Sequence, residues 1–190
     1  MLKTQLEDAK LGKLSPKQVS AIALALQSGI SENPYTAIHI LGITNAIQFE
    51  SLVAKFLDGP SDPMLARIAL KVLVSHWGFG SKYRQEIEQF AIGKSWDEDS
   101  DARLMAISCA GELARVTHDV ELIKLCLSIF ENEEELPGVR DQAYFSIART
   151  AGKSWLEIPP ASRRMNYEKD VDAGLIEWAR RQAQSAESAA

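Results

Sequence analysis

Three stretches of the sequence share one pattern of small and apolar residues, and this pattern decides the fold. They read ARIALKVL at residues 66–73, RLMAISCA at 103–110 and RDQAYFSI at 140–147, so successive copies begin 37 residues apart. In each copy an alanine occupies the fourth position and an apolar residue follows four residues later, which is the spacing of one helix face. A small residue on that face lets two helices approach closely. The interval therefore predicts a repeated helical unit.

The beginnings of several helices are also marked in the sequence. Ser15, Pro16 and Gln18 combine an N-cap serine, a proline in the first turn and a glutamine placed to complete a capping box. Asn33-Pro34 and Asp62-Pro63 repeat the cap followed by proline. The sequence has no alternating run of β-branched residues long enough for a strand. It therefore predicts an all-α protein.

The periodicity and the caps together set the expected helix boundaries. We expect helices at residues 15–29, 34–43, 46–58, 62–77, 81–94, 101–116, 119–131, 138–151 and near 166–184. A further short helix fits within the first fourteen residues. The segment 152–164 contains prolines and serines and is predicted to be a loop.

Two copies of the repeat resemble the HEAT-like repeat proteins, which are solenoids of stacked helical hairpins. The first helix of such a hairpin typically has an acidic residue, a hydrophobic residue, an arginine and, three residues later, an alanine. The sequences DARLMA at 101–106 and GVRDQA at 138–143 are similar to that pattern. The copy beginning at residue 62 has its arginine displaced by one position, and the copy beginning at residue 33 has none.

The resemblance implies a right-handed α-solenoid of stacked hairpins. We expect residues 1–184 to form a single helical domain with its clearest repeats at 33–151, followed by a flexible tail at 185–190. The helix containing Leu175 and Ile176 has one apolar and one polar face. It is expected to be the C-terminal capping helix that keeps the end of a solenoid soluble.

The composition argues against several classes of protein. The chain has 190 residues, 26 acidic and 21 basic side chains and a formal net charge of −5, which disfavours a general nucleic-acid binder. Its two cysteines are too few for a disulfide scaffold or a four-ligand zinc site. The N-terminus lacks a signal-peptide pattern, and apolar stretches such as 68–74 are too short to span a membrane. We therefore expect a soluble cytoplasmic protein with no nucleic-acid or membrane partner.

The residues that usually perform catalysis form no recognisable constellation. His39, His76 and His118 lack a second histidine at the spacing of a helical metal site, and Cys109 and Cys126 fall on apolar helix faces. No phosphate-binding glycine loop, nucleophile elbow or His-Glu-x-x-His motif is present. We therefore expect a protein that is not an enzyme, without catalytic residues, metal or cofactor.

Acidic residues cluster in two predicted loops that hold the same place in successive repeats. The candidate partner-binding acids are Asp97, Glu98, Asp99 and Asp101 in one loop and Glu133, Glu134 and Glu135 in the next. Stacked repeats would place such loops about 10 Å apart along one edge. One interpretation is a set of solvated turn residues that favour helix N-termini. The other is a docking surface for a basic partner.

Two further groups of residues are alternative binding sites. The second helix of each hairpin often faces the partner in HEAT-like proteins, and here that face includes Arg84, Glu88, Glu121 and Lys124. Trp77 and Phe79 flank a glycine turn and are either packing residues or aromatic binding anchors. The sequence leaves open whether the loops or the second helices bind.

These observations favour a non-catalytic protein-binding module. Small acidic helical proteins without catalytic motifs resemble the immunity proteins that inhibit basic bacterial toxins, so we expect a monomer that binds and inhibits a basic partner protein. The alternatives are a general adaptor or scaffold and, with less support, a HEAT-like DNA glycosylase or a lyase-like HEAT protein.

Overall fold

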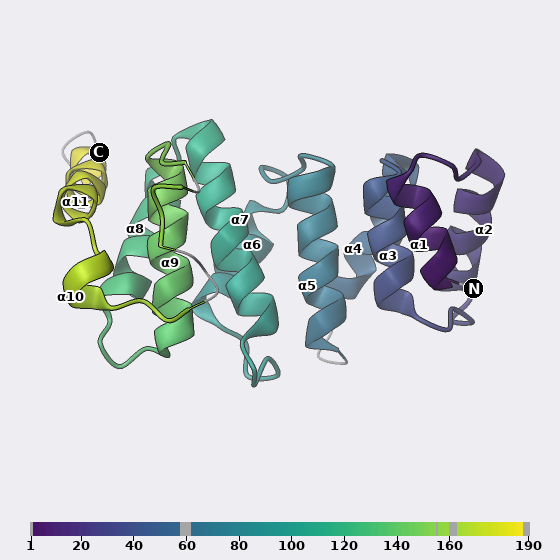
Figure 1. Ribbon diagram of the computed structural model, residues 1–190, viewed down its shortest axis with the longest axis horizontal. Helices are drawn as coiled ribbons and strands as arrows, with labels where there is room; N and C mark the ends of the chain where they lie inside the picture. The colour runs from purple at the N-terminus through teal and green to yellow at the C-terminus, as the bar shows by residue number, and fades with distance from the viewer. Residues whose placement is uncertain (1, 58–61, 155, 160–162, 188–190) are drawn as a thin grey trace. The chain divides into compact units, whose positions relative to one another are not determined.

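Figure 1 shows the computed structural model, which describes residues 2–57, 62–154, 156–159 and 163–187. Residues 185–187 are described by their backbone alone. Within these ranges every regular element is a helix, so the predicted all-α class is confirmed. The chain divides into two compact units. Unit 1 is Met1–Tyr83 with Trp96–Ala102, and unit 2 is Arg84–Ser95 with Arg103–Ala190. The single domain over 1–184 and the flexible tail stay predictions.

Unit 1 is built from short helices. They are α1 (Leu2–Lys10), α2 (Pro16–Gln27), α3 (Pro34–Ile43), η1 (Ile47–Phe49), α4 (Glu50–Ala54), η2 (Lys55–Leu57), α5 (Pro63–Lys71) and η3 (Val72–His76). Helix α3 packs against α1, α2, α5 and η3. Its residues Ile38, Ile40 and Leu41 are fully buried, so α3 supplies much of the core of this unit.

The capping signals in the sequence are confirmed in unit 1. Ser15 Oγ accepts the Gln18 N–H at 3.4 Å, and Gln18 Oε1 accepts the Ser15 N–H at 2.9 Å, which completes the capping box. Asn33 and Asp62 each accept a backbone N–H from the first turn of their helix at 2.9 Å. These bonds satisfy N–H groups that have no partner inside a helix.

Two predicted helices of unit 1 are not continuous α-helices. The segment expected at 46–58 contains only five α-helical residues, in α4, between the 3-10 turns η1 and η2; residue 58 lies outside the described residues. The segment expected at 62–77 changes after α5 into the π-helical turn η3. There the Trp77 N–H bonds the Val72 carbonyl, five residues back, at 3.0 Å. Hydrophobic spacing does not reveal such changes of helical pitch.

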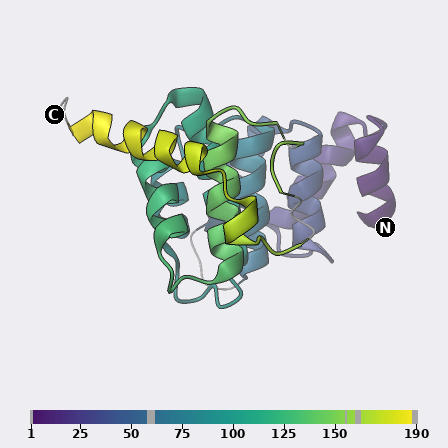
Figure 2. The ribbon, with the colours of Figure 1, turned by 60° about the vertical axis from the view of Figure 1, so that its left-hand side comes forward.

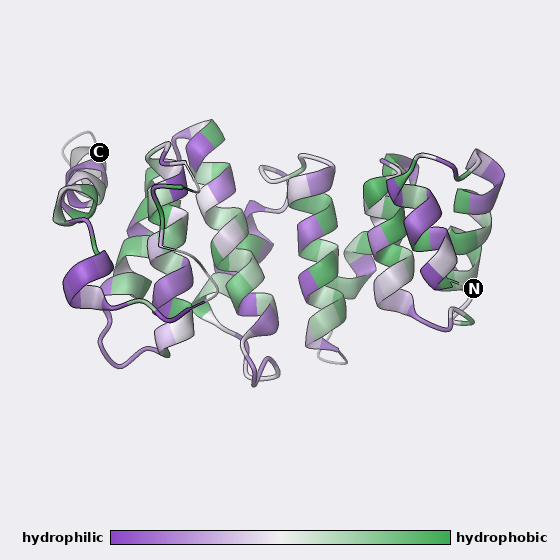
Figure 3. Cartoon of the chain, in the orientation of Figure 1, coloured by the Kyte–Doolittle hydropathy of each residue, from purple (hydrophilic) through white to green (hydrophobic). Residues whose placement is uncertain are grey.

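Unit 2 contains longer helices. They are α6 (Arg84–Ile92), α7 (Asp101–Thr117, whose first two residues belong to unit 1), α8 (Val120–Glu131), α9 (Pro137–Thr150), α10 (Tyr167–Asp170) and α11 (Ala173–Glu187). Helix α8 packs against α6, α9 and α11. The helices expected at 101–116, 119–131 and 138–151 agree with α7, α8 and α9 to within one residue at each end, whereas the helix expected at 81–94 is shorter. Figure 3 shows hydrophobic and hydrophilic residues alternating along these helices, as amphipathic packing requires.

The small and apolar residues that define the repeat are buried. Those with no exposed surface are Ala69, Leu73, Ala106, Ala110 and Ala143, and Ile147 is 1% exposed. In unit 2 a glycine also brings α7 and α9 together: a Cβ atom on Gly111 would lie 2.8 Å from Ser146 Cα, closer than real contacts allow. Ser146 Oγ donates to the Ile107 carbonyl at 2.8 Å, so the close seam between α7 and α9 includes a buried hydrogen bond.

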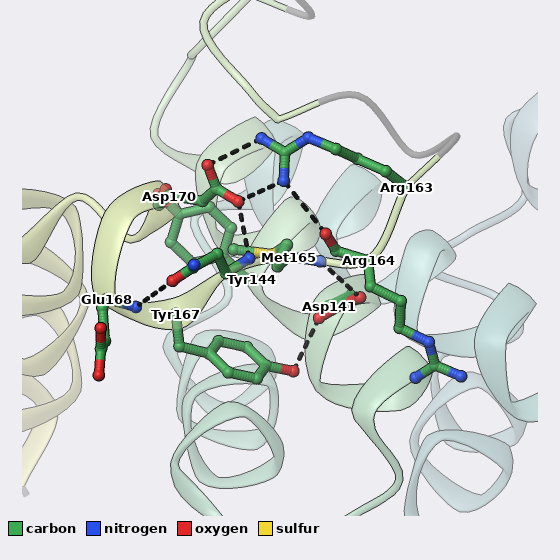
Figure 4. A network of polar contacts seen from close by, with 9 residues as sticks. Asp141, Tyr144, Arg163, Arg164, Met165, Tyr167, Glu168 and Asp170 are labelled. Atoms are coloured by element: carbon green, nitrogen blue, oxygen red, sulfur yellow. Dashed lines mark hydrogen bonds and ion pairs between the residues drawn. The ribbon is translucent and has the colours of Figure 1, made fainter.

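The segment after the 152–164 loop is held to α9 by a polar network (Figure 4). Tyr167 donates its hydroxyl to the buried Asp141 carboxylate at 2.7 Å, and burial together with that hydrogen bond raises the pKa of Tyr167 to about 12. Tyr144 Oη accepts the Asp172 N–H at 2.9 Å. Arg163 pairs with both Asp170 oxygens and lowers the pKa of Asp170 to about 2. These contacts fix the chain at the start of its last helices.

The helix expected near 166–184 is interrupted. Asp172 Oδ1 accepts the N–H groups of Gly174 and Leu175 at 2.9 and 3.2 Å, so a new helix, α11, begins after α10. Figure 2 shows α11 running across α8 and α9, and both helices contact it. Arg180 pairs with Glu131 of α8 at 2.7 Å. One face of α11 is thereby buried on unit 2.

Candidate protein-binding loops

The first acidic loop, residues 97–101, directs only part of its charge toward solvent. Asp97 is 7% exposed, and its Oδ1 accepts the Ala102 N–H at 3.2 Å. This bond forms because Ser100, with a φ of 60°, turns the chain back toward Asp97 before α7 begins. Asp97 therefore caps a helix in the isolated chain.

Asp101, the last residue of the first acidic loop, also has a partner within the protein. It is the first residue of α7, and its Oδ1 lies 3.0 Å from Arg67 Nη1 of α5. A carboxylate at a helix N-terminus is favourable as well. The remaining two acids, Glu98 and Asp99, are exposed and form no ion pair within the described part of the chain.

The second acidic loop, residues 132–136, is fastened more tightly. Arg103 binds both oxygens of Glu135, at 3.0 and 2.6 Å, and its Nε donates to the Ala91 carbonyl at 3.0 Å. The two side chains are only 16% and 13% exposed. Burial acts to raise the pKa of Glu135, but the hydrogen bonds from Arg103, the Leu136 N–H and the charge of Arg103 together outweigh it, and the pKa is lowered. Glu135 thus anchors the loop.

Next to this anchor, the second acidic loop presents a mixed acidic and apolar surface. Glu133 and Glu134 are exposed and form no ion pair among the residues that the structure describes. Leu136, two residues beyond Glu134, is 55% exposed. Asn132 Oδ1 accepts the Glu134 N–H at 3.1 Å, which fixes the turn between them. The geometry offers two free carboxylates and one apolar side chain on an ordered loop.

An arginine in each of the three repeats bonds to another segment of the chain, and sequence reasoning did not find these contacts. Arg67 pairs with Asp101, and Arg103 pairs with Glu135. Arg140 occupies the position of Arg103 in the last copy and likewise donates Nε to a preceding helix, at the Phe130 carbonyl. Its guanidinium stacks on the Tyr167 ring at 4.5 Å. The intervals differ, 34 residues from Arg67 to Asp101 and 32 from Arg103 to Glu135, so no fixed spacing in the sequence marks these pairs.

The residues predicted on the second-helix face are partly joined to one another. Arg84 lies 2.6 Å from Asp119 and 2.9 Å from Glu88, and these contacts raise the pKa of Arg84. Lys124 lies 3.2 Å from Glu121 on α8. This face therefore presents paired charges of both signs in the described structure.

The aromatic candidates differ in exposure. Trp77 is buried, and its indole Nε1 has no hydrogen-bond partner within the described residues. Phe79 is partly exposed and packs against Trp77 edge to face, with ring centroids 6.2 Å apart. Trp77 is accordingly a packing residue of unit 1.

Two of the histidines considered as catalytic candidates lie close together. The structure brings His39 and His76 together across α3 and η3, with ring centroids 6.0 Å apart, which the sequence spacing did not reveal. Burial first, and then the charge of Lys71, lowers the pKa of His39. Among the described residues no group of three or more His, Cys, Asp or Glu side chains could hold a metal ion. Burial raises the pKa of the Cys126 thiol to about 12.

The comparisons with known proteins return no matching family, no matching curated protein and no matching solved structure. None of the described helices is long and apolar enough to cross a membrane. The geometry of the chain's own residues is therefore the basis for any functional proposal.

Proposed function

We propose that this protein is a non-catalytic binding module, with the right-handed architecture of HEAT-like repeats, that recognises a basic partner protein through its acidic loops. The observation that carries this proposal is the second acidic loop. There the Arg103–Glu135 pair holds Glu133, Glu134 and Leu136 in place next to one another. The exposed pair Glu98 and Asp99 adds charge of the same sign.

Two physical properties of this loop favour protein recognition. Carboxylates that are already positioned lose little freedom on binding, so more of their attraction for a basic partner is retained in the complex. An exposed apolar side chain beside them can be desolvated in a partner pocket and supply affinity that salt does not screen. The combination suits a protein with a basic, grooved surface.

We further propose that binding inhibits the partner, as in immunity proteins that neutralise basic bacterial toxins. The net charge of −5 supports this class, which predicts a 1:1 complex. An adaptor would bind through the same loop and leave the activity of its partner intact. Assay of the captured partner with and without this protein separates the two roles.

The test compares two charge-reversed variants in a pull-down with quantitative mass spectrometry. The variant E133K/E134K removes the free acids of the second acidic loop. The control E32K/E168K makes the same change in net charge at exposed glutamates that form no ion pair in the described structure. We expect one basic protein to be captured by the wild type and the control, and to be depleted roughly tenfold or more with the loop variant.

Titration calorimetry then measures stoichiometry and salt dependence for the captured protein. We expect a 1:1 complex that weakens as ionic strength rises, because exposed charges are screened. Equal capture by the loop variant and the control, or an affinity unchanged by salt, would contradict the proposal.

A further inference from the structure

Unit 2 contains a basic cavity that the proposed function does not use. Its volume is about 460 Å³, and it is lined by Arg115, Arg149, Gly152, Lys153 and Ile158. These residues come from the end of α7, the end of α9 and the loop that follows α9. In a chain with a net charge of −5, three cations around one cavity are a local reversal of charge.

The two arginines are placed by the close seam between α7 and α9. Arg149 Nη1 donates to Ser108 Oγ of α7 at 3.3 Å, and Arg115 follows Ser108 by seven residues, or two turns, on the same face of that helix. Thr150 Oγ1, next to Arg149, donates to the Gly111 carbonyl at 3.1 Å. The bases of both side chains are therefore set by ordered backbone.

The two arginines of the cavity have no carboxylate partner among the described residues. Within the described part of the chain neither Arg115 nor Arg149 forms an ion pair. Lys153 is shared between Glu157 and Asp172, at the long distances of 3.9 and 3.6 Å. The C-terminal ends of α7 and α9 each supply about half a negative charge, which offsets only part of the two guanidinium charges.

The geometry points to a binding site for the phosphate group of a small molecule. Guanidinium groups bind phosphate oxygens through paired hydrogen bonds, and two of them with a lysine can neutralise a doubly charged group. The cavity is larger than a phosphate ion, so it has room for an attached organic part, against which Ile158 supplies an apolar wall. Among the described residues no heavy atom lies within 4 Å of the place where a Cβ atom on Gly152 would stand, so Gly152 does not narrow the cavity.

The experiment is titration calorimetry with inorganic pyrophosphate at low salt, on the wild type and three glutamine variants. R115Q and R149Q each remove one arginine of the cavity. R181Q makes the same change in charge at an exposed arginine of α11 outside the cavity. We expect the wild type and R181Q to bind alike, and R115Q and R149Q to lose affinity by roughly tenfold each.

Two outcomes would overturn the inference. One is no detectable pyrophosphate binding by the wild type, and the other is an equal loss in R181Q, which would show a general charge effect. Thermal unfolding checks each variant, and if loss of the Ser108 hydrogen bond prevents R149Q from folding, R115Q decides the question. The loop variant E133K/E134K should bind pyrophosphate as the wild type does, so this site and the partner-binding loop can fail independently.

Discussion

The two acidic loops carry similar runs of carboxylates but hold them in different ways. In the first acidic loop Asp97 turns inward to cap α7, and Asp101 forms a half-exposed pair with Arg67. In the second acidic loop no acid caps a helix in this way, and Glu135 instead binds a largely buried arginine through both oxygens. Each loop keeps two adjacent acids in solvent. A run of acids in a sequence can thus contain both structural and free carboxylates.

The largest expected difference between the loops is in their arginine pairs. The substitution R103A leaves Glu135 largely buried without its partner and should lower the free energy of unfolding by about 3 kcal/mol. The substitution R67A breaks a pair whose side chains are 39% and 31% exposed, and such a pair contributes below about 1 kcal/mol. Urea denaturation followed by circular dichroism measures both.

The variant R103K serves as a control for the second acidic loop. It keeps the charge but not the two parallel hydrogen bonds, so its stability should lie between those of the wild type and R103A. Equal effects of R103A and R67A would show that the two loops are fastened alike, contrary to the structure.

The next effect concerns the helix cap in the first acidic loop. The substitution D97A removes the acceptor for the Ala102 N–H and should lower the free energy of unfolding by about 1 kcal/mol. The matched substitution D99A removes an exposed acid and should change it by less than about 0.5 kcal/mol. Thermal denaturation of both variants tests this, and a D99A effect as large as that of D97A would refute the inward role of Asp97.

A third prediction concerns the pH dependence of stability, to which the two acidic loops should contribute differently. Because the folded-state pKa of Glu135 is below the ordinary value of 4.5, its pairing stabilises the protein above that pH, and the stabilisation is lost as pH falls through the lowered pKa. The variant E135Q should therefore lose less stability than the wild type on acidification below about pH 4.5. Urea midpoints across this range measure the difference, with E98Q as the control that should follow the wild type.

The smallest expected effect is at the exposed acids of the second acidic loop. The double variant E133Q/E134Q should change the free energy of unfolding by less than about 0.5 kcal/mol, because both side chains are solvated. The same urea experiment measures it. A loss as large as that of R103A would mean that these acids support the fold and are not free for a partner.

The repeat and the main helices could be predicted because they rest on local patterns. Buried alanines such as Ala106 and Ala143, and caps such as Ser15, follow from spacing and residue type alone. Which acids bond within the protein and which remain in solvent could not be predicted in the same way. Asp97 reaches the Ala102 N–H only because Ser100 adopts a left-handed conformation, and serine does not signal that conformation.

The remaining features of the candidate sites depend on contacts between distant residues. Glu135 looked like its exposed neighbours in the sequence, and only the position of Arg103, thirty-two residues earlier, distinguishes it. Likewise, the cavity near Arg149 forms because α7 and α9 approach at Gly111. Helical spacing describes which face of a helix is apolar, but not which residue of another helix lies opposite.

The two buried cysteines make the opening of unit 2 measurable by thiol labelling. Cys109 and Cys126 are both enclosed, both belong to unit 2, and unit 1 has no cysteine. A thiol reagent can therefore modify the chain only when α7 or α8 opens, so the rate of labelling reports the frequency of that opening without any engineered probe. Labelling the wild type in this way would measure how often unit 2 opens, and openings of unit 1 would not contribute to the signal.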